Sequence, residues 1–163
     1  MDFFSRTDIK VDLAEITKNY LKNKESWVWA NNKVAINNHN GNDYDPSDTR
    51  YKLIYSEYKY TNLAFQNTIW EELVNKLPIK KGRARLQIMK PDSLLTLHRD
   101  FEKRYHLAII TDPACLFLDA EENKTYHIPA DGYFYKIDTT KLHTAFNASN
   151  DCDRLHLVVS EYV

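Results

Sequence analysis

From Gly82 to the C-terminus, short runs of alternating apolar and polar residues are separated by turn residues. Alternation with a period of two is typical of strands that bury one face. The Gly, Pro, Asn and Asp residues between the runs favour turns over a continued ladder. The pattern predicts strands over residues 83–89, 105–111, 115–119, 124–128, 133–137, 143–146 and 155–163.

The first half of the chain predicts two helices, over residues 12–24 and 63–77, because apolar residues recur there at spacings of three and four. Asp12 and Asn62 are the expected caps, and Pro78 is expected to end the second helix. Short antiparallel strands with flanking helices predict a mainly β fold, a double-stranded β-helix of the jelly-roll, cupin-like kind.

Residues 27–60 predict a long loop between short strands, because residues 37–48 are rich in Asn, Gly, Asp and Pro. Such a loop is either a lid over a substrate or a surface excursion. A chain of 163 residues fits one domain. We expect residues 1–81 to form helical and loop support and residues 82–163 to form the jelly-roll core.

Composition excludes several classes of partner. The formal net charge is -1 and no basic stretch stands out, so neither nucleic acid nor an anionic membrane is an expected partner. No apolar run resembles a signal peptide or a spanning helix, which predicts a cytoplasmic protein. Cys115 and Cys152 lack metal-site or redox spacing and are expected to be free thiols.

His98 and Asp100 are the strongest candidates for chemistry. Their spacing places both side chains on one face of a strand, where an imidazole and a carboxylate can bind one cation. His143, at the start of a later expected strand, is the candidate third ligand. Two histidines and one carboxylate with open coordination positions are typical of non-haem Fe(II) oxygenases.

Two pairs of basic residues accompany these ligands. Arg154 and His156 share one face of the last expected strand, and Arg104 and His106 share one face of an earlier strand. A charged side chain on an inner face is costly unless an anion lies beside it. The two pairs therefore predict a cavity that receives carboxylates.

A third group shares one face of the expected strand over residues 83–89, namely Arg85, Gln87 and Met89. If that face points inward, one of them contacts substrate or cosubstrate. A register shift of one residue reverses the prediction, so these residues stay outside the predicted site.

The chain resembles the 2-oxoglutarate- and Fe(II)-dependent oxygenases, specifically the aspartyl/asparaginyl β-hydroxylase and proline hydroxylase-like group. Five segments carry the resemblance: residues 98–100, 104–106, 127–132, 143–147 and 154–157. They span about half of the chain, from residue 82 to the C-terminus, and no resemblance is found upstream.

The resemblance implies the following catalytic iron ligands: His98, Asp100 and His143. It implies Arg154 as the partner of the distal carboxylate of 2-oxoglutarate. Arg104 and His106 would assist this cosubstrate or bind a carboxylate of the prime substrate.

The implied reaction uses dioxygen to convert 2-oxoglutarate to succinate and carbon dioxide while a carbon of an amino acid, free or in a peptide or protein, is hydroxylated. Some β-hydroxylases of the group lack the metal-binding carboxylate, so Asp100 favours the proline-hydroxylase side. Two alternatives remain open. One is a metal-dependent cupin-type isomerase or hydrolase, in which Arg154 binds a sugar or phosphate anion, and the other is a non-catalytic jelly-roll interaction domain.

Overall fold

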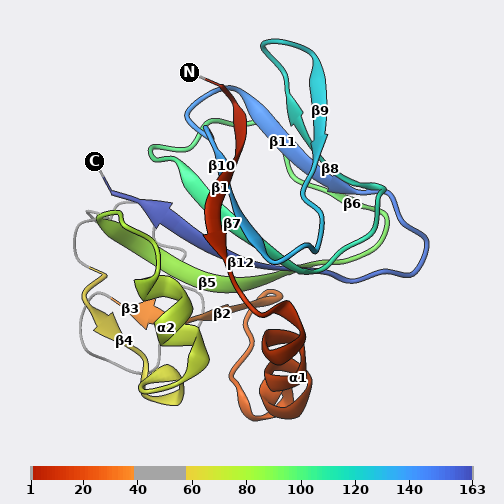
Figure 1. The fold of residues 1–163 in the computed structure, drawn as a ribbon. Coiled ribbons are helices and arrows are strands. Elements are labelled where there is room, and N and C mark those ends of the chain that lie inside the picture. Colours follow the sequence, from red (N-terminus) through yellow and green to blue (C-terminus); the bar gives the residue numbers. More distant parts are fainter. Residues whose placement is uncertain (1, 39–57, 163) are drawn as a thin grey trace.

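Two antiparallel sheets face each other in the computed structural model, which describes residues 2–38 and 58–162 (Figure 1). The large sheet has the order β1 (Phe4–Lys10), β10 (Tyr133–Ile137), β7 (Arg104–Ile110), β12 (Arg154–Glu161), β5 (Lys81–Met89) and β2 (Lys33–Ala35). The small sheet has the order β6 (Ser93–Leu94), β11 (His143–Asn147), β8 (Cys115–Asp119) and β9 (Lys124–His127). The jelly-roll, mainly β prediction is confirmed.

The large sheet is buried on both faces except at its edge strand β1. Its outer face packs against α1 (Leu13–Asn23) and α2 (Ile69–Asn75), which lie on the same side of it in Figure 1. Its inner face meets the small sheet through a second apolar cluster that includes Met89 and Phe117. Burying apolar area contributes about 25 cal/mol per Å² to the stability of the fold. The apolar contacts with the helices therefore stabilise the outer face of the large sheet, and the space between the sheets also contains polar side chains.

Strand β12 is in the centre of this arrangement, between β5 and β7. Leu155, Leu157 and Val159 point outward into the cluster that includes the helices. Arg154 and His156 alternate with them and face the inner side, beside Phe117. The period-two pattern thus directs apolar side chains to the helices and basic side chains to the inside of the roll.

The N-terminal 81 residues also supply two edge strands to the large sheet, of which β1 was not predicted and β2 falls where short strands were expected beside the loop. β1 pairs with β10 at one edge of the large sheet, and β2 pairs with β5 at the other. β1 is mostly exposed and β2 has only three residues, so neither shows a hydrophobic alternation that could be recognised. The first half of the chain is therefore more than the helical and loop support that we expected.

The two helices differ in how well they match the expectation. Asp12 caps α1 as predicted, because its Oδ1 accepts from the backbone N–H of Glu15 at 3.1 Å. The second helix is shorter than predicted: a 3₁₀ turn over Leu63–Phe65 is separated from α2 by Asn67, whose φ is +56°. Thr68 caps α2, since its Oγ1 accepts from the backbone N–H of Trp70 at 3.3 Å.

The predicted cap Asn62 has another role. It precedes the 3₁₀ turn without capping it through its side chain, and its Nδ2 donates to the carbonyl of Ala35 at 2.6 Å. This bond ties the start of the second helical segment to the end of β2. Within the described residues, neither helix nor any other is long and apolar enough to cross a membrane.

The expected long loop is described only at its ends. A 3₁₀ turn (Lys24–Ser26) precedes it, and the short strands β3 (Asn37–Asn38) and β4 (Tyr60–Thr61) pair with each other. Residues 39–57, where most of the proposed lid falls, lie outside the described residues. Both cysteines are free thiols, as predicted, with Cys115 buried and Cys152 half-buried.

Gly132 provides a test of the packing between the first strand and the roll. Its φ is +82°, and a Cβ there would lie 2.8 Å from the carbonyl oxygen of Val11. We expect Gly132→Ala to lower the free energy of unfolding in urea by about 1–3 kcal/mol, because it combines backbone strain with a backbone clash. Asn123→Gly, at a φ of +54°, is the control and should not destabilise. Equal stability of Gly132→Ala and the parent chain would contradict this packing.

Candidate metal centre

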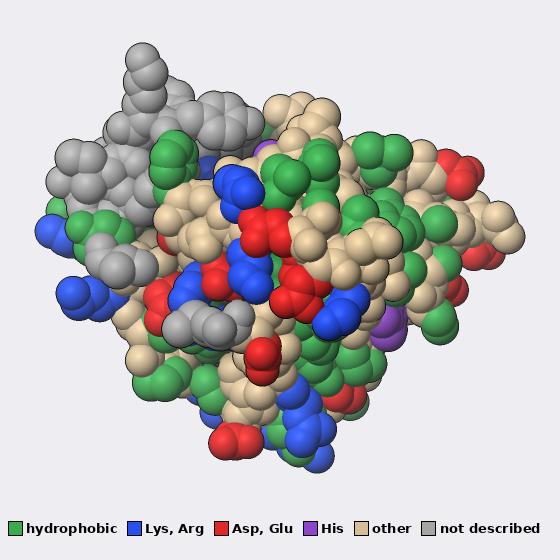
Figure 2. All heavy atoms as spheres, turned by 90° about the horizontal axis from the view of Figure 1, so that it is seen from above, with side chains coloured by type: hydrophobic (Ala, Val, Ile, Leu, Met, Phe, Trp, Pro, Cys, Tyr) green, Lys and Arg blue, Asp and Glu red, His purple; other side chains and the backbone are tan. Residues whose placement is uncertain are grey.

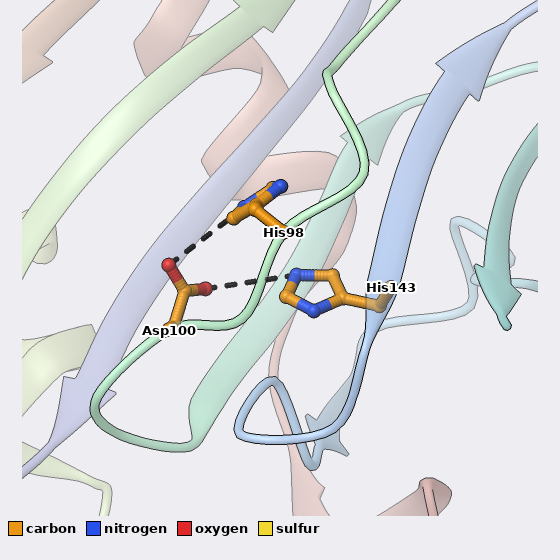
Figure 3. A group of neighbouring side chains, drawn as sticks. All are labelled: His98, Asp100 and His143. Carbon is orange, nitrogen blue, oxygen red and sulfur yellow. Dashed lines mark ion pairs between the residues drawn. The ribbon is translucent and has the colours of Figure 1, made fainter. Parts of the chain in front are cut away.

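Three side chains converge at one end of the space between the sheets (Figure 3): His98, Asp100 and His143. One potential ligand atom from each lies within 4.8 Å of the others. His143 begins β11, and His98 forms an isolated antiparallel bridge with it, in which each backbone N–H donates to the other carbonyl at 2.9 Å. The convergence therefore comes from a bridge between distant segments, not from the continuous strand through residues 98–100 that we expected.

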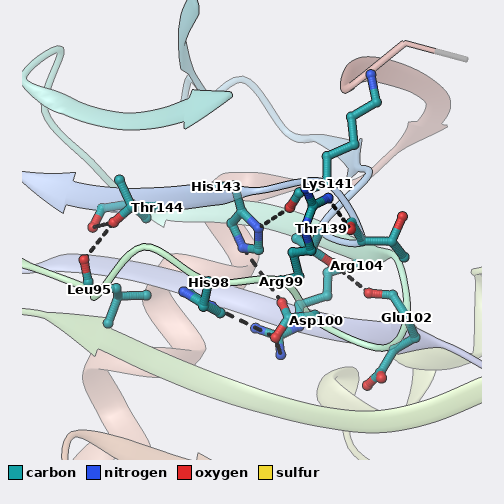
Figure 4. A network of polar contacts seen from close by, with 12 residues as sticks. Leu95, His98, Arg99, Asp100, Glu102, Arg104, Thr139, Lys141, His143 and Thr144 are labelled. Carbon is teal, nitrogen blue, oxygen red and sulfur yellow. Dashed lines mark hydrogen bonds and ion pairs between the residues drawn. The ribbon is translucent and has the colours of Figure 1, made fainter. Parts of the chain in front are cut away.

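The segment that carries His98 and Asp100 is fixed along its length, although it is not a regular strand (Figure 4). Thr144 Oγ1 donates to the carbonyl of Leu95 at 2.6 Å, before His98. The backbone N–H of Asp100 donates to the carbonyl of Thr139 at 2.8 Å. These contacts come from β11 and the turn before it, so the small sheet positions both candidate ligands.

Both histidines direct Nε2 toward Asp100, while Nδ1 of each ring faces a backbone carbonyl. His98 Nδ1 lies 2.6 Å from the carbonyl oxygen of Thr96, and His143 Nδ1 lies 2.9 Å from that of Lys141. A carbonyl oxygen only accepts, so each Nδ1 carries the proton and each Nε2 keeps its lone pair. Burial lowers the pKa of His143 below its ordinary value, which favours the neutral ring that a metal ion needs.

The Asp100 carboxylate lies between the two Nε2 atoms. Its Oδ1 is 3.8 Å from His98 Nε2, and its Oδ2 is 3.6 Å from His143 Nε2, both too long for hydrogen bonds. Arg104 Nη2 donates to Oδ1 at 2.7 Å, whereas Oδ2 is buried without a hydrogen-bond partner in the described chain. An orphaned carboxylate oxygen beside two imidazole lone pairs is a donor set that fits Fe(II).

Arg154 lines the same cavity, whose volume is about 360 Å³. The residue is 2% exposed, its Cζ lies 5.2 Å from the ring centroid of Phe117, and its Nε and Nη1 have no hydrogen-bond partner in the described residues. Burial lowers the pKa of Arg154 to about 10, so the guanidinium remains charged at neutral pH. A buried cation with unused donors is costly unless an anion joins it.

Two buried histidines, His106 on β7 and His156 on β12, contact each other on the inner face of the large sheet. His106 Nδ1 and His156 Nδ1 are 3.4 Å apart, and burial together with the charge of Arg154 holds the pKa of both rings well below the ordinary value. If one Nδ1 donates, the other accepts, and the accepting ring must carry its proton on Nε2. His106, which lines the cavity, can thus offer a neutral donor to a bound carboxylate.

All six residues that the sequence indicated as site residues line this one cavity: His98, Asp100, Arg104, His106, His143 and Arg154. Sequence reasoning left out other lining residues, among them Lys33, Arg85 and Gln87. Arg85 and Gln87 had a usable signal, because they share a face of the predicted strand, but its register was undecided. Lys33 had none, because the short strands expected beside the loop had no assigned bounds or faces.

The sequence matches the family model described as Aspartyl/Asparaginyl beta-hydroxylase over residues 9–162. The match begins far upstream of residue 82, so the resemblance is not confined to the second half of the chain as we expected. The crystal structure of AviO1 from Streptomyces viridochromogenes Tue57 is similar in fold, with a TM-score of 0.54 and 12% identity over 98% of this chain and 90% of that one. A search of curated proteins finds no match.

Arg104 is a positioning residue whose contribution can be measured. Arg104→Gln removes the charged donor from Asp100 Oδ1, and we expect it to weaken binding of Co(II), followed by visible absorption, by about 10–100-fold. Lys136→Gln is the matched control, because it breaks a 2.8 Å ion pair with Glu161 outside the cavity. Unchanged or tighter Co(II) binding in Arg104→Gln would mean that charge repulsion outweighs the positioning of Asp100.

Proposed function

Because this chain belongs to the aspartyl/asparaginyl β-hydroxylase family, we propose that it is an Fe(II)- and 2-oxoglutarate-dependent dioxygenase that hydroxylates an amino acid, free or within a peptide. One observation carries the proposal. Two histidine Nε2 atoms, an orphaned carboxylate oxygen and a buried arginine with unused donors face the same cavity.

In this proposal His98, Asp100 and His143 hold the iron. Three protein ligands leave coordination positions for a bidentate 2-oxo acid and for dioxygen. When bound, the iron would let dioxygen act as the oxidant, so that one oxygen atom enters succinate as 2-oxoglutarate loses carbon dioxide and the other enters the hydroxylated carbon. The chain itself supplies positioning and shielding from water.

Arg154 binds the distal carboxylate of 2-oxoglutarate in this account. Its planar fork suits a carboxylate, and its burial strengthens the interaction because water screens it little. His106 can donate a hydrogen bond to the cosubstrate as a neutral ring. Arg104 orients Asp100 through its hydrogen bond and also lines the cavity. The cosubstrate therefore meets a fixed cation at one end and the metal centre at the other.

The first test concerns the ligands. His143→Ala and Asp100→Ala should each reduce the conversion of 2-oxoglutarate to succinate to background, because a site with two remaining ligands holds Fe(II) poorly. Circular dichroism should show both variants folded. His127→Ala is the control, since His127 contacts the Cys115 carbonyl outside the cavity lining. Full succinate formation in a ligand variant would remove that residue from the centre.

The second test concerns the cosubstrate. We expect Arg154→Gln to weaken 2-oxoglutarate binding by about 10–100-fold, because at least one charge-assisted hydrogen bond is lost from a buried site. Anaerobic titration of the Fe(II)-loaded protein measures the dissociation constant. A metal-dependent isomerase or hydrolase would bind the metal but not 2-oxoglutarate. Unaltered affinity in Arg154→Gln would show that the distal carboxylate is held elsewhere.

A further inference from the structure

A second group of cations lines the cavity apart from Arg154: Lys33 on β2 and Arg83 and Arg85 on β5. Arg85 is in the middle of β5 and its side chain faces inward, where the residue is 8% exposed. Lys33 is half-buried at the edge of the sheet. The side chains of Arg85 and Lys33 form no hydrogen bond or ion pair with another residue in the described ranges, although both backbones are hydrogen-bonded in the sheet.

The sheet register separates Arg85 from Arg154, whereas Lys33 pairs with Gln87 and so lies two strands away from His156. Arg85 pairs with Val158 on β12, four residues beyond Arg154, which corresponds to about 13 Å along the strand. Burial lowers the pKa of Lys33 to about 8, and the nearby charges of Arg85, Arg83 and Arg104 lower it further. Arg85 is also attracted by Asp100, so the group lies toward the metal centre.

The group is costly to the folded protein as it stands. The lowered pKa of Lys33 reflects this cost, with burial as its largest cause. Burial also holds the pKa of Arg85 well below its ordinary value, again with repulsion from Arg83. Among the described residues that line the cavity, Asp100 is the one carboxylate, and Arg104 already engages it. Like charges collected in this way favour an anion that neutralises them.

One outer face of the molecule has a different charge pattern. On the face drawn in Figure 2, Lys and Arg side chains are interleaved with Asp and Glu side chains. The concentration of positive charge is therefore a property of the cavity and not of the chain as a whole, whose formal net charge is -1.

We propose that Lys33 and Arg85, with Arg83 beside them, bind an anionic group, a carboxylate or a phosphate, on the substrate that is hydroxylated. The inference rests on the proposed function, because 2-oxoglutarate is assigned to Arg154 and leaves this second group for the substrate. It narrows the substrate to one that carries this anionic group on a side chain, in addition to any main-chain carboxylate, with the anion held on the metal side of the cavity. A neutral isostere of the substrate leaves the side chains of Lys33 and Arg85 without an anionic partner.

Matched pairs of acidic and neutral probes test whether the substrate carries an anionic group. The protein, loaded with Fe(II) and saturated with 2-oxoglutarate without oxygen, is titrated calorimetrically with O-phospho-L-serine against L-serine and with L-glutamate against L-glutamine. We expect at least one acidic probe to bind about tenfold or more tightly than its neutral partner, and the pair that shows the preference distinguishes phosphate from carboxylate.

Variants then locate the preference. Lys33→Gln and Arg85→Gln should each reduce the ratio of the affinities for the acidic and the neutral probe about tenfold, while the affinity for 2-oxoglutarate changes less than twofold. Lys18→Gln, on the exposed side of α1, is the control and should keep the preference. If the buried substitution at Arg85 prevents folding, Lys33→Gln at the sheet edge still decides the result.

The outcomes separate the two proposals. Equal binding of acidic and neutral probes, or a preference that survives both substitutions, overturns the anion subsite even when 2-oxoglutarate binds normally. A wild-type protein that binds no 2-oxoglutarate overturns the proposed function instead, because that result concerns Arg154 and the metal centre.

Discussion

The burial of β12 on both faces is the constraint on which the rest of the structure depends. Its outward residues, such as Leu157, complete the apolar cluster that includes the helices, and its inward residues, Arg154 and His156, face the space between the sheets. Because side chains alternate along a strand, a slip of one residue would direct the leucines into the space between the sheets and the arginine into the apolar cluster. Packing of the helices therefore fixes the position of the cavity's basic residues.

The small sheet supplies the other half of the site. The bridge between His98 and His143 joins the segment after β6 to the start of β11, and the Thr139 carbonyl holds the backbone of Asp100. Both imidazoles are oriented by backbone carbonyls and the carboxylate by Arg104. The site is thus preorganised by groups that belong to the scaffold, and the unpaired atoms that remain point toward ligands. Inward cations that lower the stability of the empty fold are consistent with a cavity built for anions.

Sequence alone predicted the strands of the second half well, because their alternation and turn residues agree. It also identified the six residues that meet in the cavity. It placed Asp100 beside His98 on a regular strand, whereas Asp100 lies in a loop whose backbone hydrogen-bonds the Thr139 carbonyl. Pairing between distant segments is not visible in local spacing. Sequence reasoning missed β1, whose exposed edge position leaves no hydrophobic pattern, and it extended the second helix across Asn67, whose positive φ interrupts it. Arg85 needed the register that only the sheet provides.

The central claim is that one cavity holds Fe(II) and 2-oxoglutarate together, and absorption spectroscopy without oxygen tests it most directly. The account predicts a weak visible charge-transfer band that appears only when the folded protein, Fe(II) and 2-oxoglutarate are all present. A folded protein that gives no such band, and shows no binding of 2-oxoglutarate by titration, would contradict it.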